Sequence, residues 1–119
     1  TVTEAVRGVE VTLCTQGNED DRFSRLTRNV YDSTRETITN AMRYAEAERI
    51  DVIIKFLEAS LEVYILDNGR GCKNIKENNG LKGIRERTEA VGGTVRFMSV
   101  EGEGFTTIIK IPVDMEVKS

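Results

Sequence analysis

The stretch Val63-Tyr64-Ile65-Leu66-Asp67-Asn68-Gly69-Arg70-Gly71 carries more structural information than any other part of this chain. An apolar run ends there in a carboxylate, and two glycines one residue apart follow. A carboxylate at a strand end can accept hydrogen bonds from an exocyclic amine such as that of adenine. Glycine has no Cβ, so its backbone can approach a flat ring or a phosphate closely. The stretch therefore predicts a strand that ends at a ligand-binding carboxylate.

A second glycine pair lies in Asn79-Gly80-Leu81-Lys82-Gly83-Ile84, where a helical segment begins. The start of a helix carries free N–H groups and a partial positive charge, which suit phosphate. Together the two glycine segments have the parts of a nucleotide pocket. The pocket is not a P-loop, because no Gly-x-x-x-x-Gly-Lys-Ser/Thr occurs in the sequence.

The composition is that of a globular protein. With 119 residues, 39% apolar and 31% charged, the chain is long enough for one domain with its own core, and we expect residues 1–119 to form a single domain. The net charge of −3, with both signs interspersed, gives no electrostatic reason to expect nucleic acid or an anionic membrane as a partner. The chain has no histidine, which excludes histidine-based acid/base catalysis, histidine–metal sites and histidine phosphorylation within it.

The two cysteines, Cys14 and Cys72, have neither metal-ligand spacing nor a CxxC motif. We therefore expect two free thiols in a reducing compartment. There is no signal peptide and no long apolar run, so we expect a cytoplasmic domain with no membrane contact of its own.

Hydrophobic periodicity predicts strands and helices in a definite order. A strand begins at residue 9 and ends near residue 17, and apolar spacings of three and four predict a long helix over about residues 22–48. Two hairpins and a second helix complete the order: strands 50–57 and 61–66, a loop at 72–79, a helix at 80–91 and strands 94–100 and 105–111. Hairpins with helices between them favour an α+β two-layer α/β sandwich over a doubly wound parallel sheet.

The long helix carries a polar stripe. Glu36 and Asn40 are four residues apart, and Arg43 and Tyr44 follow on the same side. An amide oxygen suits a hydrated Mg²⁺, a carboxylate can orient a nucleophile, and a cation can neutralise phosphate. Taken alone, the stripe is better explained as a solvated helix face. Its combination with the two glycine segments favours a phosphate site.

These three segments resemble motifs of a known family. Glu36-Thr37-Ile38-Thr39-Asn40-Ala41 is similar to the N box of the GHKL (Bergerat-fold) ATPase superfamily, and residues 67–71 resemble its first glycine box. Residues 79–87, running on to Gly92-Gly93, resemble the second. The likeness extends over about residues 5–113 and is greatest to the ATP-binding catalytic domain of bacterial two-component sensor histidine kinases. It implies a mixed, mainly antiparallel sheet covered on one face by helices.

The resemblance also implies roles at the adenine end of the pocket. Asp67 matches the aspartate that accepts the adenine N6 hydrogen bond. Gly69 and Gly71 match glycines that let the adenine and the lid backbone fit. A late hydroxyl that helps to anchor Asp67 and the adenine matches Thr106 or Thr107, and we favour Thr106. The family often has threonine directly after the last glycine, where this chain has Phe105.

At the phosphate end, the resemblance implies a second group of residues. Asn40 matches the Mg²⁺ ligand, Glu36 the candidate general base, and Arg43 a basic position facing the phosphates, while Tyr44 stands where histidine is common. The backbone N–H groups that meet the phosphates belong to Gly80, Leu81, Lys82 and Gly83. We expect Arg85 and Arg87 to be surface charges on the second helix, with Arg85 able to reach phosphate or a partner domain.

The function implied is a protein-histidine kinase with ATP and Mg²⁺ as cofactors. The γ-phosphoryl group would pass to a histidine on a separate dimerisation domain and then to a response regulator. Because the acceptor histidine is missing, we expect a fragment of a longer kinase, monomeric on its own. Two alternatives stay open: an anti-sigma-factor-type serine kinase of the same superfamily, and a degenerate, non-catalytic interaction module.

Overall fold

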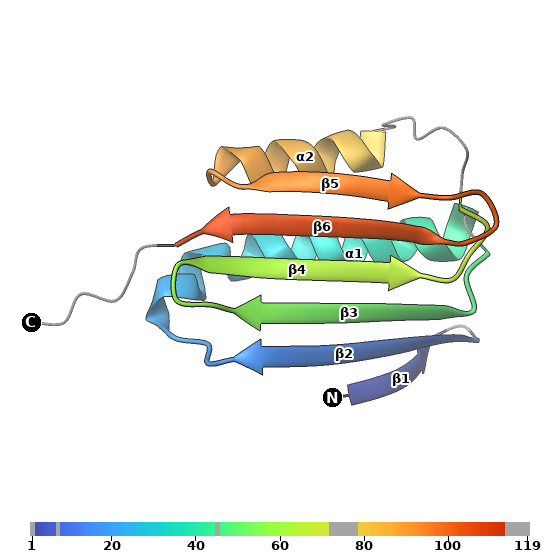
Figure 1. Ribbon diagram of the computed structural model, residues 1–119, viewed down its shortest axis with the longest axis horizontal. Coiled ribbons are helices and arrows are strands. Elements are labelled where there is room, and N and C mark those ends of the chain that lie inside the picture. Colours follow the sequence, from blue (N-terminus) through green and yellow to red (C-terminus); the bar gives the residue numbers. More distant parts are fainter. Residues whose placement is uncertain (1, 7, 45, 72–78, 114–119) are drawn as a thin grey trace, which may run out of the picture.

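The computed structural model describes residues 2–6, 8–44, 46–71 and 79–113. These residues form a six-stranded sheet of order β1-β2-β3-β4-β6-β5 (Figure 1). The strands are β1 (Val2–Val6), β2 (Val9–Gly17), β3 (Arg49–Phe56), β4 (Ser60–Asp67), β5 (Thr94–Ser99) and β6 (Phe105–Pro112). Strands β2 and β3 are parallel, and the other neighbouring pairs are antiparallel.

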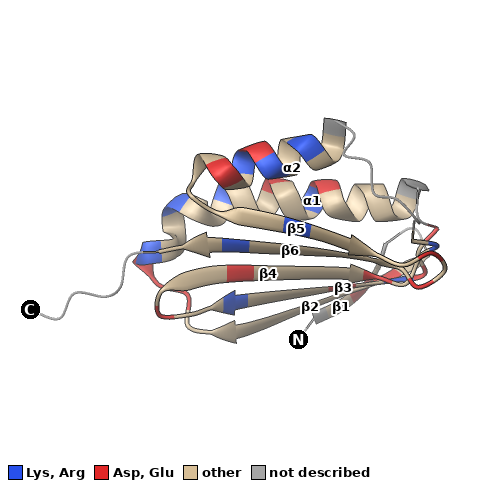
Figure 2. Ribbon diagram, turned by 45° about the horizontal axis from the view of Figure 1, so that its top comes forward, with Lys and Arg blue, Asp and Glu red and all other residues tan. Residues whose placement is uncertain are grey.

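The described part of the chain has two α-helices, α1 (Thr27–Tyr44) and α2 (Asn79–Ala90), which lie on the same face of the sheet (Figures 1 and 2). A short 3-10 helix, η1 (Asp21–Leu26), leads into α1. This arrangement confirms the predicted α+β two-layer sandwich with a mixed, mainly antiparallel sheet covered on one face. Among the described residues, no helix has the length and apolar character needed to cross a bilayer.

The structure differs from the sequence prediction at three places. Strand β1, which pairs antiparallel with β2 along its whole length, was not predicted because its five residues carry no clear alternation. The long helix begins as η1, in which Phe23 and Leu26 are both buried at the three-residue spacing of a 3-10 turn. Its predicted extension to residue 48 is wrong, because Glu46 adopts a positive φ of 52°, which ends a right-handed helix. Of the predicted loop at 72–79, residues 72–78 lie outside the described residues.

One core lies between the sheet and the helices. Alternate residues of the central strands face the helices, as the two-residue period of a strand requires. The sheet contributes Ile50, Val52, Val63, Ile65, Ile109 and Ile111. The helical layer contributes Phe23, Leu26, Ala41, Leu81 and Ile84. This burial fixes the rotation of α1 and α2 about their own axes, and hence the direction of their polar residues.

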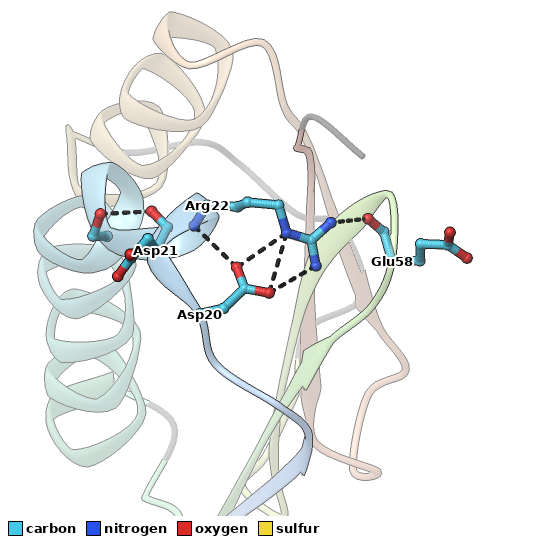
Figure 3. Close-up of polar contacts among 5 residues, drawn as sticks. Asp20, Asp21, Arg22 and Glu58 are labelled. Carbon is cyan, nitrogen blue, oxygen red and sulfur yellow. Dashed lines mark hydrogen bonds and ion pairs between the residues drawn. The ribbon is translucent and has the colours of Figure 1, made fainter. Parts of the chain in front are cut away.

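A cluster of polar contacts joins the start of η1 to the β3–β4 turn (Figure 3). The Asp20 Oδ1 caps η1 by accepting a hydrogen bond from the Arg22 backbone N–H at 3.0 Å. The Asp20 carboxylate also accepts from the Arg22 guanidinium, whose Nη1 donates to the Glu58 carbonyl oxygen at 2.5 Å. Hydrogen bonding to Arg22 holds the pKa of the Asp20 carboxyl below its ordinary value. The contacts fix where the helical layer begins relative to the sheet.

At the opposite end of the sheet, the turn between β5 and β6 lies against the segment that follows β4. Gly104 has a φ of +93°, and a Cβ added there would collide with the carbonyl oxygen of Asp67. A Cβ on Gly71 would collide with the carbonyl oxygen of Val100. The backbone N–H of Gly102 donates to the Arg70 carbonyl oxygen at 2.5 Å. These close backbone approaches hold residues 67–71 in place.

The same segment is fixed from its other side by Asn68. The Asn68 Oδ1 accepts hydrogen bonds from the backbone N–H groups of Glu48 and Arg49, at 2.9 and 2.8 Å. The backbone N–H of Asn68 donates to the Arg49 carbonyl oxygen at 3.2 Å. Residues 67–71 are therefore held between the start of β3 and the β5–β6 turn.

Gly104→Ala tests the close approach to Asp67, and Gly102→Ala is its matched control. Both glycines have positive φ, but a Cβ on Gly102 meets no atom within 4 Å. The control is expected to lower the free energy of unfolding by about 1 kcal/mol, the strain of alanine at such a φ. Gly104→Ala is expected to lower it by about 3 kcal/mol or more, because the Asp67 backbone must also move. Denaturant unfolding measures the two losses. If both variants lose the same free energy of unfolding, the close contact between Gly104 and Asp67 does not contribute to stability.

Candidate nucleotide site

Three segments that were singled out in the sequence meet at one end of the molecule. The last residue of β4, the C-terminal half of α1 and the start of α2 all lie at this end, next to the β5–β6 turn (Figure 1). Helices α1 and α2 run antiparallel, as two contacts show. Asn29 near the start of α1 donates to the Arg87 carbonyl oxygen near the end of α2, whereas Glu36 and Asn40 lie beside Gly80.

Asp67 ends β4 on the face of the sheet that the helices cover. Its cross-strand partners are Ile50 and Phe105, and its carboxylate is half-buried. The Oδ1 accepts a hydrogen bond from the Gly69 backbone N–H at 2.8 Å. Burial raises the pKa of the Asp67 carboxyl above its ordinary value, and hydrogen bonds from the backbone of Gly69 and Phe105 act in the opposite direction. A half-buried carboxylate with a fixed orientation is well suited to accept from a planar amine.

The strand register distinguishes the two candidate threonines. Thr107 pairs with Ile65 and therefore shares the helix-covered face with Asp67, as its diagonal neighbour across β4 and β6. Thr106 pairs with the exposed Leu66 and Met98 on the opposite face. The Thr107 side chain is fully buried, and its Oγ1 has no hydrogen-bond partner among the described residues. The register therefore favours Thr107 over Thr106 as the hydroxyl next to Asp67, because Thr106 lies on the other face of the sheet.

The start of α2 lies against the polar stripe of α1. A Cβ added to Gly80 would collide with the Glu36 Oε1 and would lie 3.2 Å from the Asn40 Nδ2. No residue larger than glycine fits at position 80 without displacing Glu36. The Asn40 Nδ2 is buried and has no hydrogen-bond partner among the described residues. A buried donor without a partner is unfavourable, and an oxygen of a bound ligand would satisfy it.

The chemistry of this group fits a Mg²⁺-bound phosphate chain. The first turn of α2 includes Gly80 and Lys82, and the N–H groups of a first turn have no acceptor within their own helix. Such a helix start favours anions. Carboxylate and amide oxygens from Glu36 and Asn40 are ligands that a hydrated Mg²⁺ accepts. Groups that could bind phosphate and groups that could hold Mg²⁺ therefore lie together beside Gly80.

The remaining predicted residues differ in what the structure says of them. Leu81 is buried in the core, so its side chain packs while its backbone belongs to the first turn of α2. Lys82 is exposed, and Gly83 lies against the Arg87 side chain. Arg43 and Tyr44 belong to α1, but their side chains lie outside the described residues. Gly69 is buried beside Asp67, and Gly71 lies close to backbone of the β5–β6 turn.

A hollow of about 550 Å³ next to Gly69 is a poor phosphate site. It is open to solvent and lined by Glu46, Glu48, Asn68, Gly69, Arg70, Glu101 and Gly102. Its lining has three carboxylates, and the Arg70 guanidinium lies 3.6 Å from the Glu46 carboxylate. Such a surface would repel phosphate. The charge distribution thus favours the start of α2 over this hollow as the place for phosphates.

Asn68, whose role was not identified from the sequence, holds the segment around Asp67 in place and has no proposed contact with a ligand. Its two hydrogen bonds reach the start of β3, far from it in the sequence. A signal was available, because asparagine before glycine is typical of a side chain that bonds to backbone in a turn. The partner strand could not be identified from that signal.

Comparison with known proteins is consistent with this geometry. A family model described as "Histidine kinase-, DNA gyrase B-, and HSP90-like ATPase" matches residues 27–115. Sensor histidine kinase LiaS of Bacillus subtilis (strain 168) is 29% identical over 113 residues, which cover 92% of this chain and 29% of LiaS. Signal transduction histidine-protein kinase/phosphatase DegS of the same organism is 29% identical over 109 residues, 86% of this chain and 28% of DegS. The chain therefore spans less than a third of the curated relatives it matches.

Solved structures show the same fold. The histidine kinase domain of the Erythrobacter litoralis EL346 blue-light activated histidine kinase aligns with a TM-score of 0.66 at 21% identity, covering 87% of this chain and 55% of that one. The ATP binding domain of PrrB from Mycobacterium tuberculosis aligns with a TM-score of 0.63 at 19% identity, covering 73% and 68%. The family match extends over most of the chain and includes all three motifs. The chain belongs to the histidine kinase-, DNA gyrase B- and HSP90-like ATPase family.

Proposed function

We propose that this chain binds Mg²⁺-ATP and donates the γ-phosphoryl group to a histidine on a separate dimerisation domain of a sensor histidine kinase, for relay to a response regulator. The observation that carries the proposal is the position of Gly80 against Glu36 and Asn40, at the same end of the fold as Asp67. The similarity to sensor histidine kinases supports the choice of a histidine as acceptor.

Each end of the site has its own task. The Asp67 carboxylate accepts the adenine amine, and the neighbouring Thr107 hydroxyl supports that contact in place of Thr106. The first turn of α2 and the Asn40 amide bind phosphate oxygens. Mg²⁺, which Asn40 would hold together with water, supplies neutralisation of phosphate charge when bound. The chain thus acts mainly by binding and orienting the triphosphate.

Glu36 acts on the acceptor. Its carboxylate lies beside the start of α2, where the terminal phosphate would be held. It can accept the imidazole proton while the histidine nitrogen bonds to the γ-phosphorus and the bond to the ADP oxygen breaks. The acceptor domain must therefore approach over α1 and the start of α2.

Asp67→Asn tests the adenine contact. Loss of a charged hydrogen bond in a half-buried site is expected to weaken ATP binding about tenfold or more, measured by calorimetric titration. The matched control is Asp51→Asn on the neighbouring strand β3, where the carboxylate pairs with Arg49. Undiminished ATP affinity in Asp67→Asn would contradict the assigned role. No binding by the folded wild type, with or without Mg²⁺, would contradict the proposed function as a whole.

The same Asp67 variant has an expected signature in stability. Because the pKa of Asp67 is raised in the folded state, the wild type loses stability as pH rises from the ordinary carboxyl pKa through the raised one. Asn at this position removes that loss. Without nucleotide, the variant is therefore expected to unfold at the same or a higher temperature than the wild type at pH 7.

Thr107→Val and Thr106→Val form a matched pair that tests which threonine serves the site. Valine at 107 fills the same space and removes a buried hydroxyl without a partner, so the apo protein is expected to gain stability. Its ATP affinity is expected to fall about two- to tenfold, the effect of one hydrogen bond. Thr106→Val is expected to leave ATP affinity unchanged. If calorimetric titration shows that Thr106→Val weakens ATP binding and Thr107→Val does not, Thr106 is the hydroxyl that serves the site.

Gly80→Ala tests the position of Glu36. The added methyl group pushes aside a flexible carboxylate, so thermal unfolding is expected to change little while phosphoryl transfer falls about tenfold or more. Transfer is measured as label from γ-labelled ATP on the acceptor domain joined to this chain. In a Glu36→Ala background, Gly80→Ala is expected to have no additional effect. Independent, multiplicative losses would show that the two residues do not act together.

A further inference from the structure

The interface between α1 and α2 is polar, unlike the core beneath it. On α2, Gly80, Gly83 and Arg87 are spaced by three and four residues and share the side that faces α1. On α1, the residues with the matching spacing are Asn29, Ser33, Glu36 and Asn40. The contacts of Asn29 with the Arg87 carbonyl and of Glu36 with Gly80 fix the register of this interface. Figure 2 shows charges of both signs along the two helices.

Arg87 was expected to be a surface charge, and it lies instead in this interface. A Cβ added to Gly83 would lie 3.3 Å from the Arg87 Nη1, so the side chain runs back along α2 towards the helix start. The Arg87 Nε is buried and has no hydrogen-bond partner among the described residues. Glycine at 83 leaves the space that this conformation occupies.

The guanidinium of Arg87 also has no carboxylate partner among the described residues, whereas other arginines do. Arg22, Arg28 and Arg49 pair with Asp20, Asp32 and Asp51 at 3.0 to 3.3 Å. Arg85, on the same helix, points to β5: it donates to the Val95 carbonyl oxygen at 3.3 Å, lies 5.5 Å from the centre of the Phe97 ring and approaches Glu89. The structure thus assigns Arg85 to packing and leaves Arg87 as a partly buried cation in the interface.

A partly buried cation without a counter-ion is unfavourable, and its position indicates what would compensate for it. Gly83 precedes Arg87 by one turn and follows Gly80 by three residues, so their side-chain positions are about 5–6 Å apart. The Arg87 guanidinium therefore lies within about one Debye length of the group around Gly80, Glu36 and Asn40. The start of α2, on the same side of this helix, is a place where an added anion would be favoured.

We propose that Arg87 is a further nucleotide-binding residue, whose guanidinium serves as counter-ion to the phosphate chain through the α1–α2 interface. This inference rests on the proposed function, because it takes the triphosphate to lie at the start of α2. It adds a cation from the second helix to the donors of its first turn. The contribution of Arg87 to nucleotide affinity should then grow with the charge of the phosphate chain. The affinity for adenosine, which has no phosphate, should not depend on Arg87.

The experiment compares Arg87→Gln with Arg85→Gln in the full 119-residue chain. Both variants remove one positive charge from the same helix, but only the first removes it from the interface. Calorimetric titration with Mg²⁺-ATP, ADP and adenosine at low and high KCl separates charge from packing. Arg87→Gln is expected to weaken ATP binding about three- to tenfold and ADP binding less, with adenosine unchanged and the differences smaller at high salt. Arg85→Gln is expected to match the wild type, and Arg87→Lys to recover part of the loss.

The other outcomes are distinct. If both glutamine variants bind ATP like the wild type, or if both lose affinity equally, Arg87 has no specific role and the inference is wrong. If Arg87→Gln weakens adenosine as much as ATP, its effect is structural and the inference is also wrong. If the folded wild type binds none of the three ligands, the proposed function fails and the inference fails with it. Thermal unfolding of each variant shows that the titrations compare folded proteins.

Discussion

The contact between the β5–β6 turn and the end of β4 is the constraint on which the site depends. Gly104 brings its backbone against the carbonyl of Asp67 at a distance that no side chain would permit. Asn68 holds the same segment to the start of β3. Because the neighbours on both sides fix this backbone, the Asp67 carboxylate is kept half-buried although burial raises its pKa. The carboxylate is therefore already oriented to accept a hydrogen bond before a ligand amine binds.

The phosphate end is built on a different principle. Helices α1 and α2 pack through polar and glycine residues, and the Asn40 Nδ2 and the Arg87 Nε are buried there without hydrogen-bond partners among the described residues. Unsatisfied polar groups lower stability, and they persist where a ligand later satisfies them. The proposed adenine end is thus fixed by backbone contacts, whereas the proposed phosphate end includes two buried side-chain nitrogens, of Asn40 and Arg87, that have no partner among the described residues.

Much of this was accessible from the sequence, and the exceptions have a common physical cause. Alternation predicted both hairpins, and the motifs around Glu36, Asp67 and Gly80 predicted which segments meet. Spacing within one segment did not show that Thr107, and not Thr106, faces Asp67, because that depends on the register of β4 with β6. The location of Arg87 likewise depends on the antiparallel packing of α1 and α2. The local sequence pattern predicts individual helices and strands. How helices and strands that are distant in the chain pack against one another has to be read from the structure.

Helix α1 connects the two ends of the molecule. Phe23 and Leu26 of the preceding η1 hold its beginning in the core, next to the contacts of Arg22, while Glu36 and Asn40 lie towards its far end. Each residue of an α-helix advances the chain by about 1.5 Å and turns it by about 100°. One residue inserted between Leu26 and Glu36 would therefore turn the acid away from Gly80 even with every contact of the sheet intact. The number of residues between Leu26 and Glu36 therefore determines whether the Glu36 carboxylate faces Gly80, independently of the packing of the sheet.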